Sequence, residues 1–345
     1  MKTALSRFLH SQNASLLGVI VAGAVLLTIQ SSGTFLSSNS VQTFFQFLAI
    51  PIVIGLAQMA TLAVGQLNLA VGAIGGFSAC FAAVLMADAG LPAWLGGLVA
   101  IVVGLLAGLL NGVLVVLTRI NGFIVTLATM TILTGAQYAL VGTRTIPASA
   151  WPELASIGSA RPLGIPLIFW FAIIIAGLLA YFYRNALPAR HMLASGGNEL
   201  AATLTGISNG RSLITAHALS GLLCGVAAFL ALASLPGANK SVGGDWMLSS
   251  FAAPIIGGVA LTGGGVAVLG TVFAATIIRL VDSARAAFQL DPSWVNFVIG
   301  AVVLGTVALE RVRATRRTPK SGRKATPPDA PPTAAVRAVV QGGTP

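Results

Sequence analysis

The sequence predicts an all-α fold, a polytopic bundle of membrane-spanning helices, and three observations carry this prediction. Of the 345 residues, 56% are hydrophobic and only 8% are charged, whereas soluble proteins carry about 25% charged residues. Long apolar runs are unbroken rather than alternating with polar residues, which is typical of helices and not of barrel strands. The 40 glycines fit as well, because glycine is more frequent in membrane helices than in soluble ones.

About ten runs are long enough to cross a hydrocarbon core of ~30 Å, which takes about 20 apolar residues. In chain order they are 15–32, 42–64, 69–87, 93–117, 122–141, 165–183, 212–235, 246–262, 266–288 and 294–310. Two boundaries are marked only by short breaks, Gly65 to Asn68 and Gly263 to Gly265. We expect the first run to stay as a helix and not to be removed as a signal peptide, since many spans follow it.

Basic residues between the spans predict that both termini lie in the cytoplasm. Eight of the 19 Lys and Arg residues follow Glu310, and the remaining eleven divide six to five between the inner and outer sides. The expected organisation is a cytoplasmic segment 1–14, a transmembrane domain 15–310 with an inner loop 184–211, and a basic, Pro-rich, disordered tail 311–345. The basic tail fits a cytoplasmic end near anionic lipid better than it fits a nucleic-acid partner.

Catalytic, metal and cofactor sites are not expected. The best candidate for an ATP-binding loop, Lys240–Ser241, follows Asn239 where the pattern requires glycine. The three histidines are scattered, and the two cysteines lie inside apolar runs, as small buried residues do. Gly76-Phe-Ser78-Ala-Cys80 approaches a nucleophile motif but ends in Cys. Transport is therefore favoured over catalysis.

No predicted span holds a carboxylate near its middle. The nearest is Asp282, three residues from both Arg279 and Arg285, a spacing that places all three on one helix face. Two interpretations stay open: a local ion pair near the outer interface, or a gate in a transport pathway.

The inner loop contains a short helix with marked ends. Asn198 is a good N-cap, Glu199 lies in the first turn where the helix dipole favours an anion, and Gly206 suits the C-terminal stop. Such a helix could dock into a groove on a partner, or it could be an ordinary connecting helix. From these residues alone the two interpretations are equal.

Several motifs resemble one family. The inner loop matches the pattern G-G-N-E-x-A-A-x-x-x-G-I, Gly65-Gln-Leu-Asn-Leu-Ala-Val-Gly72 looks like G-G-I-D-L-S-V-G, and 122–127 looks like F-I-V-T-L after its glycine. Asn111-Gly112 and the segments 251–258 and 261–264 look like N-G, A-A-x-x-x-G-G and L-T-G-G. In this order and spacing, over about residues 40–310, the chain resembles the permease subunits of bacterial ATP-binding-cassette importers of ribose, xylose, arabinose and galactosides.

The resemblance implies a multi-pass protein of the bacterial inner membrane that works with cytoplasmic ATPase subunits and a periplasmic sugar-binding protein. It also implies a second permease, either an identical copy in a homodimer or a paralogue. It implies no nucleic-acid partner and no cofactor. The residues it assigns to ATPase coupling are Gly196, Gly197, Asn198, Glu199, Ala201, Ala202 and Gly206.

A monosaccharide or similar polar solute needs hydrogen-bonding side chains along its path. The candidates are Gln58, Gln66, Asn68, Asn111, Phe123 and Thr126. Polar residues in spans also form interhelical hydrogen bonds, so a structural role competes with a substrate role. Asn68 and Ala70 stand where the family pattern has Asp and Ser, and Gln66 replaces its second glycine. The alternative function is a stand-alone secondary transporter, which the lack of core carboxylates disfavours.

Overall fold

The computed structural model describes residues 12–289 together with 291, 294, 297, 300, 301, 304 and 305, and it confirms the all-helical fold. Twelve α-helices are described: α2 (Gln12–Gln30), α3 (Ser38–Leu62), α4 (Val71–Asp88), α5 (Ala93–Thr118), α6 (Gly122–Val141), α7 (Pro152–Ser159), α8 (Leu167–Asn185), α9 (Leu187–Gly197), α10 (Glu199–Leu204), α11 (Asn209–Ser234), α12 (Trp246–Ile256) and α13 (Val268–Ala287). Three 3-10 turns, η1 (Thr34–Leu36), η2 (Ala148–Ala150) and η3 (Pro162–Gly164), and a two-stranded ribbon of β1 (Ile146–Pro147) and β2 (Gly237–Ala238) complete the described elements.

Seven of these helices, α2, α3, α4, α5, α6, α8 and α11, are long and apolar enough to cross a membrane. They correspond to the first seven predicted spans. The predicted eighth span, 246–262, is wrong as one crossing helix, because α12 ends at Ile256 and its 11 residues measure about 17 Å. Pro254 and the glycines after it account for the stop, since Gly258 and Gly263 both have positive φ.

Helix α13 forms over most of the predicted ninth span, but its three charged residues set it apart from the seven apolar helices. The predicted tenth span, 294–310, falls largely outside the described residues. So do most of segment 1–14 and all of the tail 311–345.

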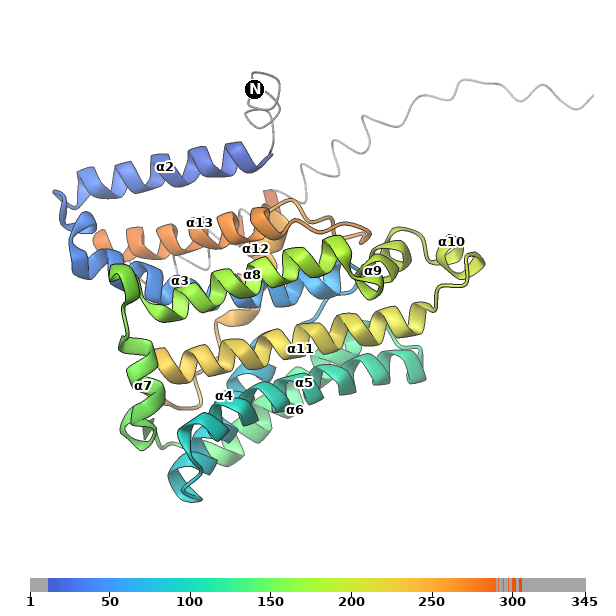
Figure 1. Cartoon of the computed structure of the whole chain (residues 1–345), viewed down its shortest axis with the longest axis horizontal. Helices are drawn as coiled ribbons and strands as arrows, with labels where there is room; N and C mark the ends of the chain where they lie inside the picture. Colours follow the sequence, from blue (N-terminus) through green and yellow to red (C-terminus); the bar gives the residue numbers. More distant parts are fainter. Residues whose placement is uncertain are drawn as a thin grey trace, which may run out of the picture. The chain divides into compact units, whose positions relative to one another are not determined.

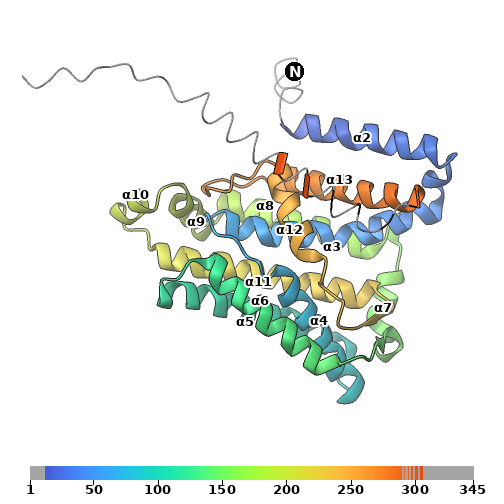
Figure 2. The same cartoon turned by 180° about the vertical axis from the view of Figure 1, so that it is seen from behind.

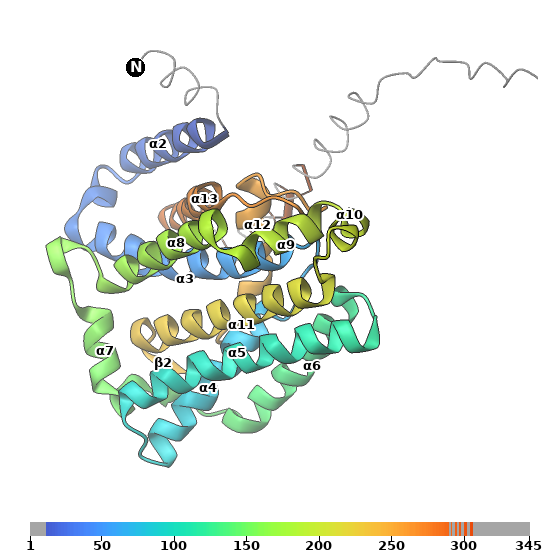
Figure 3. The same cartoon turned by 45° about the vertical axis from the view of Figure 1, so that its right-hand side comes forward.

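The long helices run side by side between two ends of the bundle (Figure 1). One end carries α7 and the turn η1, and we refer to it as the α7 end. The other, the α10 end, carries α9, α10 and the connection between α5 and α6 (Figure 3). The view from behind shows α3 passing through the interior of the bundle (Figure 2), in agreement with the burial of nearly all its residues from Leu48 onward.

Helices α5 and α11 form the closest pair, and glycine permits it. A Cβ added at Gly104 would lie 2.6 Å from the carbonyl oxygen of Gly221, and one at Gly221 would lie 2.3 Å from that of Gly104. Gly108 faces the same stretch of α11, with His217 O at 2.3 Å. Inside a membrane the hydrophobic effect does not drive helices together, because lipid tails are as apolar as the side chains. Close packing at small residues such as these glycines holds the helices together instead.

The α7 end is closed by polar and aromatic contacts. Trp151 is fully buried and its indole N–H donates to the carbonyl of Leu232 at 3.0 Å. Arg144 pairs with Asp88 at 2.6 Å, and these hydrogen bonds raise the pKa of the guanidinium. Both side chains are about half exposed, so the pair contributes little to stability.

Candidate functional site

The chain breaks its helices between α3 and α4, within the buried part of the bundle. The break predicted at Gly65 to Asn68 is confirmed: residues 63–70 are non-helical, and Gly65 has φ +69°. In hydrocarbon each backbone group freed by such a break needs a partner. We therefore expect side chains around the break to form hydrogen bonds with the freed backbone groups.

Asn68 satisfies the break from inside it. Its side-chain oxygen accepts from the N–H of Ala70 at 2.9 Å, and its amide nitrogen donates to the hydroxyl of Ser220 on α11 at 3.0 Å. Gln58, in the amide orientation that satisfies both its groups, donates to the carbonyl of Asn68 at 2.9 Å and accepts from its N–H at 3.2 Å. Both side chains are fully buried.

Helix α6 supplies the remaining support. The hydroxyl of Thr126 accepts from the N–H of Leu69 at 3.1 Å, and Gln66 accepts from the N–H of Gly122 at 3.2 Å. Four predicted path residues, Gln58, Gln66, Asn68 and Thr126, thus meet around one break. Their hydrogen bonds to the backbone show that they hold the break in place.

Asn111 belongs to a second polar cluster beside the first. Its side-chain oxygen accepts from the hydroxyl of Thr129 at 2.6 Å, but its amide nitrogen has no partner among the described residues. His217 is also fully buried, and neither of its ring nitrogens has a described partner. A Cβ on Gly122 would lie 2.4 Å from the Gln66 oxygen and 3.5 Å from His217 Nε2, so the two clusters adjoin.

His217 was not among the path candidates of the sequence analysis and was noted there only as one of three scattered histidines. The available signal was a lone imidazole inside an apolar run. Buried polar groups are nearly always hydrogen-bonded, so the unpaired nitrogens of Asn111 and His217 are exceptions among the described residues. Phe123 differs from the other five predicted path residues, because its ring is 42% exposed at the start of α6.

The short inner helix forms with the predicted ends. The side chain of Asn198 accepts from the N–H of Ala201 at 2.9 Å, and Glu199 occupies the first turn of α10. Gly206 has φ +82°, and Ile207 N–H bonds the carbonyl of Ala202 at 3.0 Å, which closes a Schellman stop.

Helix α10 exposes an apolar face. Leu200 is 72% exposed and Leu204 is 81% exposed, one turn apart on the same face, while Ala202 is buried. Asn209 fixes the helix from behind by donating to Glu199 O and to the Thr203 hydroxyl. The capped helix thus presents two exposed leucines, which the sequence analysis had not singled out.

A junction of glycines joins the inner loop to the broken helices. The N–H of Gly264 donates to the carbonyl of Ala63 at 3.0 Å, and a Cβ on Gly196 would lie 2.0 Å from that same oxygen. A Cβ on Gly263 would lie 2.6 Å from the nitrogen of Gly65. Three segments far apart in sequence thus meet backbone to backbone. We refer to Gly65, Gly196, Gly263 and Gly264 as the glycine junction.

Together, a membrane bundle with a polar break in its interior and an exposed short helix joined to that break define a membrane transport protein. Residues 43–307 match the family described as the branched-chain amino acid transport system permease component. The chain belongs to this family. In it the ATPase lies on a separate subunit, so the chain is the permease component of an ATP-binding-cassette importer and a multi-pass protein of the bacterial inner membrane.

Curated relatives extend over most of the chain. The ribose import permease protein of Haemophilus influenzae is 27% identical, covering 91% of this chain and 97% of its own length. The fructose import permease protein of Rhizobium meliloti is 28% identical, covering 89% and 88%. The D-allose transport system permease protein of Escherichia coli is 27% identical, covering 81% and 85%. No solved structure matches the chain.

Proposed function

We propose that the chain is the membrane-spanning subunit of an importer for a monosaccharide or a related small polar solute, driven by an ATPase that docks on α10. The observation that carries the proposal is the exposed face of Leu200 and Leu204 on a helix capped at both ends. Partner docking commonly uses such apolar anchors on rigid elements. The predicted coupling residues lie in this helix or at its ends. Glu199, Ala201 and Ala202 belong to α10, residues 196–198 precede it, and Gly206 follows it.

The glycine junction gives the docked helix a direct route to the polar break. Gly196 is the last residue but one of α9, two residues before Asn198, and it packs against the carbonyl of Ala63, the residue that follows α3. The break at 66–70 follows immediately. Displacement of α9 and α10 by the ATPase is therefore transmitted through backbone contacts that leave no side chain to absorb it. Coupling requires the two ATPase states to contact α10 unequally.

The solute path is assigned to the interior beside the break, at Asn111 and His217. Their unpaired nitrogens offer hydrogen-bonding groups that suit sugar hydroxyls. The relatives named for ribose, fructose and D-allose support a sugar. Gln58, Gln66, Asn68 and Thr126 shape the path by holding the break, and Phe123 lies outside this cluster.

The topology follows from the docking assignment. The α10 end faces the cytoplasm, with both termini there, and the α7 end receives solute from a periplasmic binding protein. A second copy of the chain completes the pore as a homodimer. These assignments rest on the family resemblance and on the distribution of basic residues.

The test of docking compares Glu199→Arg and Leu200→Asp with the wild type in proteoliposomes that contain the complete importer. We expect both variants to insert and both to lose most solute uptake, because a charge reversal and a buried charge each weaken the interface by about tenfold or more. Uptake, ATP hydrolysis and co-purification of the ATPase are the readouts.

Leu163→Asp is the matched control, since Leu163 is 89% exposed at the α7 end. Unchanged uptake and ATPase retention in both α10 variants would contradict the docking site. Uptake by the purified chain alone, driven by an ion gradient, would instead support a stand-alone secondary transporter.

A further inference from the structure

Two hollows adjoin along the contact between α2 and α13. The larger, of about 630 Å³, lies at the α7 end, where η1 and the start of α3 meet the last turns of α13. The smaller, of about 320 Å³, follows the same two helices toward the middle of the bundle. Leu27 lines both hollows. They are therefore neighbouring parts of one surface.

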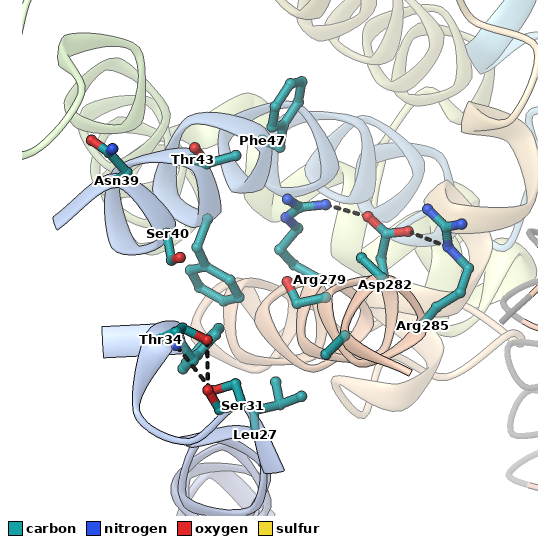
Figure 4. Close-up of a pocket in the computed structure, with 15 residues that line it drawn as sticks. Leu27, Ser31, Thr34, Asn39, Ser40, Thr43, Phe47, Arg279, Asp282 and Arg285 are labelled. Atoms are coloured by element: carbon teal, nitrogen blue, oxygen red, sulfur yellow. Dashed lines mark hydrogen bonds and ion pairs between the residues drawn. The ribbon is translucent and has the colours of Figure 1, made fainter. Parts of the chain in front are cut away.

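The larger hollow has hydroxyl-bearing and charged side chains among a mostly apolar lining, and it carries excess positive charge. Asp282 pairs with Arg279 and with Arg285, as the sequence spacing predicted, the second pair at 3.3 Å. One carboxylate against two guanidinium groups leaves a net charge of +1. Figure 4 shows these residues on α13 with the hydroxyl-bearing residues Ser31, Thr34, Ser40 and Thr43 of the opposite segments around the same pocket.

Arg279 is held in place but is not saturated. Its guanidinium lies 5.3 Å from the ring centre of Phe47 and 6.0 Å from that of Phe44, within the range of cation–π attraction. Its Nε has no hydrogen-bond partner among the described residues, although the atom is buried. The pocket is thus lined by an arginine that its ion pair and two aromatic rings hold in place.

The smaller hollow is a greasy groove. Apart from Gln30 and Gly23, its lining residues are apolar, among them Val19, Leu26, Ile277, Leu280 and Phe288. Only 11% of the apolar window of α2 is buried, so the groove opens beside a helix that otherwise faces lipid. A Cβ on Gly23 would lie 3.4 Å from Leu280, so α2 and α13 are in contact at this point of the groove.

We propose that this surface binds one phospholipid, with its phosphodiester in the larger hollow beside Arg279 and Arg285 and an acyl chain in the smaller hollow. The single negative charge of a phosphodiester matches the +1 of the arginine–aspartate–arginine group, and arginine is well suited to bind phosphate oxygens. The adjoining groove favours a lipid over free phosphate or a sugar, because neither has an apolar tail to fill it.

The site is tested by native mass spectrometry of the purified importer titrated with phosphatidylglycerol. Parallel titrations use diacylglycerol, which has the chains without the phosphate, and inorganic phosphate, which has the charge without the chains. We expect phosphatidylglycerol to bind about tenfold more tightly than diacylglycerol. Inorganic phosphate should fail to displace it at equal concentration.

Two variants divide the headgroup from the chain. Arg285→Gln leaves Arg279 and Asp282 paired and should weaken phosphatidylglycerol binding about tenfold, with little effect on diacylglycerol. Gly23→Leu fills the groove and should weaken both lipids. Arg161→Gln, an exposed arginine at the same end, and Gly18→Leu, with open space around its Cβ position, are the controls and should bind as the wild type does.

Equal binding of phosphatidylglycerol and diacylglycerol would overturn the phosphate assignment. Displacement by inorganic phosphate alone would overturn the lipid assignment in favour of a simple anion site. A wild-type affinity in both Arg285→Gln and Gly23→Leu would show that the lipid binds elsewhere. If Gly23→Leu does not assemble, the Arg285→Gln titration still decides the outcome.

Discussion

At the scale of single residues, Asn68 shows why one departure from the family pattern is tolerated. At the position where the family pattern has an aspartate, the side chain of Asn68 accepts from Ala70 N–H and donates to the Ser220 hydroxyl. The oxygen that caps the break is retained, and the amide nitrogen uses a hydroxyl that can either donate or accept. Asparagine therefore satisfies the hydrogen bonds of the break without an ionisable group.

A prediction about a single residue concerns His217. If its imidazole contacts solute, His217→Ala should lower uptake at limiting solute concentration about tenfold, because one hydrogen bond to the solute is lost. ATPase docking and assembly should be unchanged. Uptake against solute concentration in proteoliposomes separates a raised KM from a lowered maximal rate.

The matched control is Cys224→Ala, which alters another fully buried side chain on the same helix, two turns from His217. The solute path would have to be placed elsewhere if both variants transported like the wild type. Equal losses of assembled complex in both would point to packing instead.

At the scale of elements, the pairing of α5 with α11 depends on glycine more than on any side chain. Gly104→Leu should destabilise the bundle by about 3 kcal/mol or more, since even a Cβ would meet the backbone of α11 at 2.6 Å. Gly177→Leu is the control, because the position on α8 has nothing within 4 Å.

Thermal unfolding of the purified chain in detergent measures the difference. A melting temperature for Gly104→Leu equal to that of Gly177→Leu would contradict the close packing of these two helices. A fall confined to Gly104→Leu would support it.

Elements could be predicted where local chemistry decides them. Seven spans follow from apolar run length, and the ends of α10 follow from Asn198 and Gly206. The end of α12 was not predicted, because the run 246–262 is apolar throughout. Its length was weighed above the helix-stopping tendency of Pro254 and the glycines after it. The exposure of Leu200 and Leu204 was equally invisible, since a six-residue helix does not reveal which face packs.

At the scale of the whole molecule, sequence placed the correct residue types near the site but not their partners. Gln58, Gln66, Asn68 and Thr126 were expected along one path, yet hydrogen bonds between segments up to 152 positions apart decide that they support the break. The glycine junction depends on three such distant segments. Sequence spacing alone gives no measure of backbone approach.

Site-specific photocrosslinking from α10 in the assembled importer tests most directly whether the ATPase docks on this helix. A photoreactive residue at position 200 should crosslink to the ATPase, and one at position 163, equally exposed at the opposite end, should not. Crosslinking from position 200 to the solute-binding protein, or from position 163 to the ATPase, would contradict the docking assignment and the orientation built on it.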